Sequence, residues 1–286
     1  MYTNTTPIIV TFKSRDVIFR CLDNLQKFKK ILILDNSKDT ETKTDIEKKY
    51  KNVCFYNSRY NLGYSRGHNY LMRKVKTEYA LLISPDVFIE ESEFNQIEHV
   101  TKKLKNNFAI LAPNDSNYKK KNYGIISNSY KNNFDDIYEV DYVNGFFMFM
   151  NLKKIFKAGL FDKNFFLYNE DIDLCNRVKK NKENIYIIKN LKIEHLSSAS
   201  SNIGIEYDKC KNWHWLWSKF YLEKKNNGYF FALIKYFPVT LKLLFKSCFY
   251  LFISKKKFLT NFMRLKGLIA SLLGKKSFYR PNIINN

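Results

Sequence analysis

The residues of this sequence that could do chemistry are carboxylates, amides and hydroxyls that stand in short polar clusters directly after apolar runs. The clusters occupy 11–14, 35–37, 61–69 and 84–86. One such cluster alone, for example Asp35 with its two neighbours, is typical of a turn or a helix cap. Four clusters in order, each at the predicted carboxyl end of a strand, indicate the ligand-binding edge of a sheet.

The third cluster combines glycines with a basic residue ahead of a predicted helix. Gly63 and Gly67 allow a ligand to approach the backbone closely, although both are also compatible with a plain helix entry. Arg66 can pair with a phosphate or be an ordinary exposed arginine. Further along, Glu170, Asp171 and Asp173 fall in the first turn of another predicted helix, where the helix dipole alone favours carboxylates.

These clusters need strands and helices to position them. Apolar runs of strand length occur at 7–12, 31–34, 53–56, 79–83, 108–111 and 143–150, and helical patterns occur at 15–28, 40–50 and 65–76. Alternation of strand and helix at this spacing predicts an α/β fold with a mostly parallel sheet covered on both faces.

Composition limits the class of protein. With 286 residues, 45% of them hydrophobic, the chain can bury a large core, which excludes global disorder. Five cysteines without a C-x-x-C pair argue against a disulfide framework or a zinc site and favour a reducing compartment. The formal charge is +22, and residues 205–286 carry 16 basic against 3 acidic residues. This shift predicts a boundary between a domain over 1–204 and a basic helical region over 205–286.

The basic region is also apolar. Residues 229–280 contain no uncharged stretch near the roughly 20 residues that a spanning helix needs. On one continuous helix, Lys235, Lys242, Lys246 and Lys257 fall within a stripe of about 60°, with Pro238 splitting or kinking the helix. We expect association with an anionic membrane surface. The alternative is a tail packed on its own domain. No motif for nucleic-acid binding is present, and we expect no nucleic-acid partner.

Seven segments together carry a resemblance to a known family. They are VTFKS, LILDNS, NLGYSRGHN, LLISPD, VNGFFMFM, GLFDKNFFLYNEDIDLCNRV and IEHLSSAS, in order from Ile8 to Ser200. This pattern resembles family 2 glycosyltransferases with the GT-A fold, and rhamnosyltransferase-like members in particular. The resemblance implies a nucleotide-diphospho-sugar transferase fold with a mostly parallel central sheet flanked by helices.

The resemblance also implies which residues hold the sugar donor. Thr11 is expected to line the base pocket, and Asp35 to contact the pyrimidine or its ribose. Further donor-binding positions are implied along the same edge: Asn61, Gly63, Arg66, Gly67, Ser84, Asn144 and Gly145.

Two sites of chemistry follow from the same resemblance. Asp86 and His195 are expected to ligate a divalent cation, Mn²⁺ or Mg²⁺, although Ser84 stands where relatives usually have Asn or Asp. Asp171 is expected to be the general base of an inverting enzyme. Glu170 is then expected to orient the acceptor.

The resemblance predicts a metal-dependent enzyme that uses a deoxythymidine-diphosphate rhamnose donor and a glycan or lipid-linked acceptor in cell-surface polysaccharide synthesis. Its expected location is the inner face of the cytoplasmic membrane. Another hexosyl donor and a catalytically silent scaffold subunit are the alternatives. Residues 113–140 are expected to form an acceptor-side loop. Trp213, Trp215 and Trp217 are compatible with an acceptor groove, an interface anchor or plain core.

Overall fold

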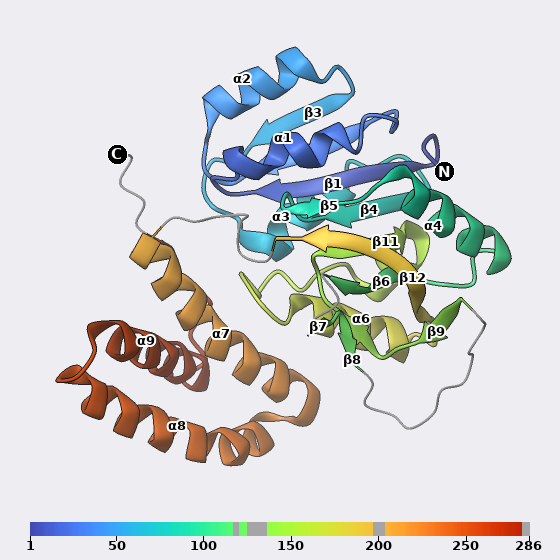
Figure 1. The fold of residues 1–286 in the computed structure, drawn as a ribbon. Helices are drawn as coiled ribbons and strands as arrows, with labels where there is room; N and C mark the ends of the chain where they lie inside the picture. The colour runs from blue at the N-terminus through green and yellow to red at the C-terminus, as the bar shows by residue number, and fades with distance from the viewer. Residues whose placement is uncertain (117–119, 125–135, 197–203, 282–286) are drawn as a thin grey trace. The chain divides into compact units, whose positions relative to one another are not determined.

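The chain forms two compact units in a computed structural model that describes residues 1–116, 120–124, 136–196 and 204–281 (Figure 1). The first unit comprises Met1–Asp162 and Asp171–Ser201, and the second comprises Lys163–Glu170 and Asn202–Asn286. The segment 163–170 therefore groups with the C-terminal helices. The expected boundary between residues 204 and 205 stays a prediction.

The first unit is built on one sheet with the strand order β3-β2-β1-β4-β11-β6-β12-β5. Strands β3, β2, β1 and β4 run parallel to one another, and β11 is inserted antiparallel between β4 and β6. The strands of the whole unit are β1 (Thr5–Thr11), β2 (Ile31–Asp35), β3 (Val53–Asn57), β4 (Tyr79–Ile83), β5 (Val87–Phe88), β6 (Ile110–Ser116), β7 (Lys120–Lys121), β8 (Tyr123–Gly124), β9 (Ile137–Glu139), β10 (Tyr142–Val143), β11 (Phe147–Asn151) and β12 (Ile185–His195).

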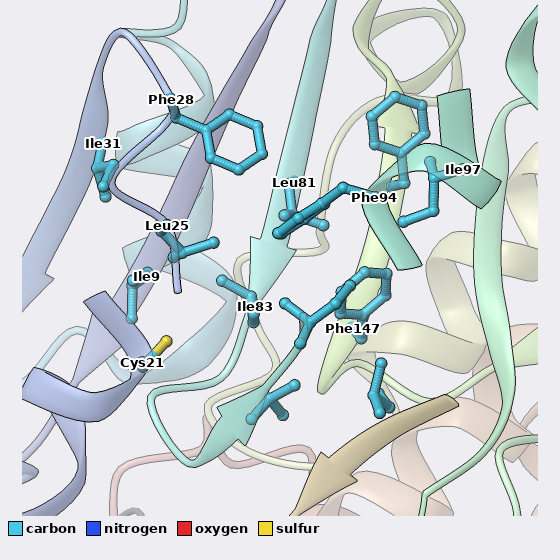
Figure 2. Packing of buried hydrophobic residues seen from close by; sticks show 14 of the residues in the cluster. Ile9, Cys21, Leu25, Phe28, Ile31, Leu81, Ile83, Phe94, Ile97 and Phe147 are labelled. Atoms are coloured by element: carbon cyan, nitrogen blue, oxygen red, sulfur yellow. The ribbon is translucent and has the colours of Figure 1, made fainter. Parts of the chain in front are cut away.

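Helices cover both faces of this sheet because the buried strands present apolar side chains to each side in alternation. Ile9, Ile33 and Leu81 belong to one core cluster, and their neighbours Ile8 and Leu32 belong to the other. Figure 2 shows the first cluster, which includes side chains from α1 and α4. The helices of the unit are α1 (Arg15–Asp23), α2 (Thr40–Lys49), α3 (Gly63–Met72), α4 (Glu91–Lys103), α5 (Leu152–Ala158) and α6 (Glu170–Lys180).

The predicted α/β class is thus confirmed, with the central sheet flanked by helices. Strand β12 was not predicted, although it carries His195. It pairs parallel with β6, and its register shifts between Ile188 and Lys192. Beyond that irregularity β12 pairs antiparallel with β5, and His195 lies opposite Val87. The end of β12 therefore lies beside the segment that follows β4.

One predicted strand is wrong in a way that matters for the site. The apolar run 143–150 is divided between β10 and β11, with Asn144, Gly145 and Phe146 outside both strands. The amide of Asn144 donates to the carbonyl of Asn122 over 2.9 Å. The amide of Gly145 donates to a carboxylate instead of to a neighbouring strand. Local apolar character could not reveal that the backbone leaves the ladder here.

The described residues 204–281 of the second unit form the helices α7 (Gly204–Asn227), α8 (Tyr229–Leu251) and α9 (Lys255–Leu272). Phe220 of α7, Leu243 of α8 and Leu268 of α9 share one buried cluster. Of the split or kink expected at Pro238, the split does not occur, because α8 runs through that residue. Packing on two neighbouring helices compensates for the one backbone hydrogen bond that proline removes.

The prediction that four lysines form a single stripe on one helix is also wrong in part. The chain turns between α8 and α9, so Lys257 lies on a different helix from Lys235, Lys242 and Lys246. Among the helices that the structure describes, none is both long and apolar enough to cross a membrane.

The three tryptophans have different surroundings. Trp213 and Trp217 are buried and stack on each other with centroids 6.3 Å apart, which makes them core residues of the second unit. Trp215 is 38% exposed and lies edge-on to Tyr168. Half of the expected acceptor-side loop 113–140, namely residues 117–119 and 125–135, lies outside the described residues.

Candidate active site

Asp35 ends β2 and is fully engaged in local hydrogen bonds. Its carboxylate accepts from the hydroxyl of Thr11 at 2.9 Å, from the Ser37 amide at 2.8 Å and from the Asp39 amide at 3.1 Å. These bonds fix the ends of β1 and β2 together and build the Asx turn that the sequence left as the alternative. The contacts predicted for Thr11 and Asp35 with a nucleotide stay predictions.

The loop before α3 is held by amide side chains. Asn36 accepts from the Ser58 hydroxyl at 3.1 Å and from the Leu62 amide at 3.0 Å. Asn61 accepts from the Gly63 amide at 2.9 Å. Gly63 has a φ of 72°, a backbone conformation that disfavours other residues. Asn61 and Gly63 therefore shape the helix entry, and their contact with a donor is untested.

Gly67 is explained by helix–sheet packing. A Cβ at this position would lie 3.0 Å from Val10 Cγ2 and 3.4 Å from Leu34 Cδ2. The glycine thus lets α3 approach β1 and β2, whereas the sequence suggested close approach of a donor. Arg66, on the same helix, is exposed. Donor binding by either residue stays a prediction.

Asp86 and His195 come together at the carboxyl end of β4. Asp86 is 1% exposed, and His195 Nε2 lies 3.6 Å from its Oδ2. Pairing of His195 with Val87 and a 3.1 Å hydrogen bond from the Leu196 amide to the Asp86 carbonyl hold the two segments side by side. The ring of Phe146 stacks on the imidazole, with centroids 4.4 Å apart.

The Asp86 carboxylate is a candidate for cation binding. Neither of its oxygens has a hydrogen-bond partner among the described residues, which is costly for a buried charge unless a cation compensates it. No cluster of three His, Cys, Asp or Glu side chains able to hold a metal occurs in the part of the chain that the structure describes. One carboxylate and one imidazole still fit a divalent cation that takes its other ligands from phosphate and water.

Asp171 is held by the break between β10 and β11. Its Oδ2 accepts from the Gly145 amide at 2.9 Å, and its Oδ1 accepts from the Ile172 amide at 2.8 Å. The Tyr64 hydroxyl donates to the Gly145 carbonyl. Burial raises the pKa of the Asp171 carboxyl, while the Ile172 and Gly145 amides act in the opposite direction. A carboxylate with a raised pKa is a stronger base.

The structure therefore brings the predicted base and the predicted cation ligands to one dipeptide. Gly145 binds Asp171, and the next residue, Phe146, stacks on His195. The amide of Ser84 donates to the Phe146 carbonyl at 2.9 Å, which ties β4 to the same dipeptide.

The other acidic residues of α6 differ in their surroundings. Asp173 is 1% exposed and forms an ion pair with Arg177 at 2.9 Å. This pair within α6 is consistent with a role of Asp173 in stabilising the helix. Glu170 opens α6 and is 5% exposed. Its expected contact with an acceptor stays a prediction.

Two residues of the site were missed by sequence reasoning. Tyr64 lies inside the NLGYSRGHN segment, and its place between two glycines before a helix was the available signal. Phe146 was attributed to an aromatic core strand, because nothing local distinguishes it from Phe147 and Phe149, which are buried.

Comparison with known sequences gives a family. The profile of glycosyl transferase family 2 matches residues 6–160. The chain is also 21% identical over 203 residues to the low-salt glycan biosynthesis hexosyltransferase Agl10 of Haloferax volcanii, an alignment that covers 65% of this chain and 64% of that relative. The match thus spans less than two thirds of the relative's length.

Solved structures share the fold. A mannosyltransferase from Pyrobaculum calidifontis in complex with GDP-Man and Mn²⁺ superposes with a TM-score of 0.58 at 10% identity, covering 96% of this chain and 89% of that one. GalNAc-T7 with UDP, GalNAc and Mn²⁺ superposes with a TM-score of 0.58 at 10% identity, covering 68% of this chain and 44% of that one. These likenesses identify the GT-A fold. With a family profile that matches more than half of its residues, the chain belongs to glycosyl transferase family 2.

Proposed function

We propose that this protein transfers a hexosyl group from a nucleotide-diphospho-sugar to a hydroxyl acceptor with inversion at the anomeric carbon. The observation that carries the proposal is the Gly145–Phe146 dipeptide. It contacts Asp171 through a 2.9 Å hydrogen bond and His195 through a stacked ring. A proton acceptor and a cation ligand that contact one backbone segment are groups that displacement of a diphosphate requires.

Asp171 is the general base in this proposal. Its carboxylate removes the proton of the acceptor hydroxyl while that oxygen forms a bond to the anomeric carbon. The bond from this carbon to the donor diphosphate breaks at the same time, and the diphosphate leaves with the electron pair. The raised pKa of Asp171 strengthens the base, and the amides of Ile172 and Gly145 keep the carboxylate oriented.

Asp86 and His195 would hold the divalent cation, Mn²⁺ or Mg²⁺. When bound, the cation would stabilise the negative charge that develops on the leaving diphosphate. Phe146 fixes the plane of the His195 ring by stacking. The Mn²⁺ in the two solved structures named above supports this assignment by analogy.

The donor sugar is proposed at the level of hexoses. Deoxythymidine-diphosphate rhamnose is the first donor to test because of the family resemblance, and other hexosyl nucleotides are the alternative. Agl10 is described as a hexosyltransferase, which supports the hexosyl class. The proposed donor contacts are Thr11, Asp35, Asn61, Gly63, Arg66, Gly67, Ser84, Asn144 and Gly145.

The acceptor is proposed to be a glycan or lipid-linked saccharide used in cell-surface polysaccharide synthesis at the inner face of the cytoplasmic membrane. In this division of labour, residues 1–204 catalyse transfer and residues 205–286 associate with the membrane. The strongly basic, apolar composition of the second region supports this proposal.

Replacement of the base tests the central step. Asp171→Asn should lower transfer from a panel of nucleotide sugars by about 10²–10⁴-fold and leave binding of the free nucleotide diphosphate unchanged. Asp16→Asn is the matched control, because Asp16 also lies in a first helical turn but is exposed. Retained turnover in Asp171→Asn, with the control equal to wild type, removes Asp171 from the role of base.

A further inference from the structure

Helix α8 exposes an apolar face that the fold of the second unit leaves without a partner. At about 100° per residue, eight apolar side chains of this helix fall on one arc of about 140°. This arc, the outward face, consists of Phe230, Phe231, Ile234, Phe237, Leu241, Leu244, Phe245 and Phe249, all of them exposed. The opposite side carries Ala232, Leu243 and Ser247, which are buried.

The exposed fractions of the apolar side chains distinguish α8 from an ordinary surface helix. Phe230 is 74% exposed, Phe237 60% and Phe245 72%, so the largest side chains of the helix are also among its most exposed. Scattered apolar residues on a surface need no explanation, but a contiguous apolar face indicates a binding surface. The turn after α8 extends this face with Phe252, which is 89% exposed.

Positive charge borders the outward face. Lys235, Lys242 and Lys246 lie along one edge, within about 40° of helical rotation, and Lys235 contacts Glu223 of α7. Lys255–Lys257 open α9 directly after the exposed turn and are also exposed. From Lys224 to the end, the sequence contains no Asp or Glu.

We propose that the outward face of α8 inserts into the interfacial layer of an anionic lipid membrane, with the helix parallel to the surface and its lysines on lipid phosphates. A bulky apolar arc beside a lysine edge is the pattern of an in-plane membrane helix. A second copy would bring like charges together, and a nucleic acid would leave the phenylalanines in water. The proposal does not depend on glycosyl transfer; only delivery to a lipid-linked acceptor rests on the proposed function.

Cosedimentation of the full chain with lipid vesicles tests the proposal. Phe237→Ser with Phe245→Ser keeps the charge and changes exposed positions only, so the fold should persist. Loss of membrane contact by two phenylalanines should weaken partitioning by at least about 100-fold. Phe156→Ser is the matched control, because Phe156 is 46% exposed on α5 of the other unit.

A second variant separates charge from insertion. Lys242→Gln with Lys246→Gln should lower binding to vesicles of phosphatidylcholine with phosphatidylglycerol by about fivefold per lysine. Binding to vesicles of phosphatidylcholine alone should not change. Donor hydrolysis without vesicles should equal the wild-type rate in all three variants, so that loss of membrane binding is distinguished from loss of catalysis.

Three results overturn the proposal. The first is wild-type protein that does not bind vesicles of either composition. The second is a double phenylalanine variant that binds like wild type. The third is a concentration-dependent dimer in sedimentation velocity that the phenylalanine variant abolishes, which assigns the outward face to a second copy of this chain.

Discussion

Asp86→Asn is expected to change the stability of the protein in opposite directions with and without a divalent cation. The Asp86 carboxylate is 1% exposed, and neither oxygen has a hydrogen-bond partner among the described residues. The nearest cationic candidate, His195 Nε2, is 3.6 Å from Oδ2 and is charged only when protonated. In a chelator the buried negative charge is therefore poorly compensated, and asparagine removes that charge with almost no change of shape.

The magnitude follows from the cost of burying a charge. Desolvation of one carboxylate costs several kcal/mol, part of which His195 recovers, so Asp86→Asn should stabilise the metal-free protein by about 1–3 kcal/mol. At about 2–4 °C per kcal/mol, the midpoint of thermal unfolding of the first unit should rise by several degrees. With Mn²⁺ at 1,000 times its Kd, the wild type should gain about 4.1 kcal/mol, which exceeds the advantage of the variant in chelator, and the variant should gain nothing.

The measurement is thermal unfolding of both proteins in chelator and across a titration with Mn²⁺. The two stability curves should cross, with the variant more stable in chelator and the wild type more stable at saturating Mn²⁺. Asp16→Asn, at an exposed carboxylate, should follow the wild type in both conditions. Parallel curves without a crossing would refute the reasoning that Asp86 is kept charged and unpaired for a cation.

Three further outcomes test the geometry around the dipeptide. Gly145→Ala should lower turnover by about 10²-fold, because its Cβ would lie 2.5 Å from the Tyr64 hydroxyl and 3.4 Å from Asp171 Cβ. Adding Tyr64→Phe to this variant should restore part of the lost turnover. Strictly additive effects in the double mutant would contradict this explanation. Burial raises the pKa of Asp171, and the base must be deprotonated to act. The value of kcat/KM should therefore fall as the pH decreases through a value above the usual carboxyl pKa of about 3.9. An acid limb of the pH profile at the usual value would argue against Asp171 as the base. Phe146→Leu should raise the Mn²⁺ concentration for half-maximal activity without changing the acid limb, and an unchanged metal titration shows that stacking on His195 is dispensable.

The sheet was predictable because its strands are buried on both faces. Runs such as 31–34 and 79–83 have no polar position, and each is followed by a polar cluster, so their order along the chain indicated a doubly covered sheet. Strand β12 was harder, because its register on β6 shifts between Ile188 and Lys192 and its last two residues also pair with β5. That change depends on tertiary pairing, which no local pattern contains.

The site was predictable in its residue types and less so in their contacts. Asp86 and His195 are 109 positions apart in the sequence, and only a family pattern could bring them together. Gly67 shows the opposite limit. A glycine in a motif suggested ligand approach, whereas the Val10 side chain accounts for its missing Cβ through helix packing. Motif membership and local packing select the same residue type for different reasons.

The break between β10 and β11 holds the proposed base close to the proposed cation ligand His195. Gly145 and Phe146 are consecutive, so their Cα atoms are about 3.8 Å apart whatever the surrounding loops do. Asp171 accepts a hydrogen bond from the first residue, and His195 stacks on the second. The Ser84 amide, just after β4, donates to the carbonyl of Phe146. The short dipeptide therefore limits how far apart Asp171 and His195 can lie while both contacts persist. A single residue inserted between 145 and 146 should separate the two functions more effectively than a substitution of either side chain.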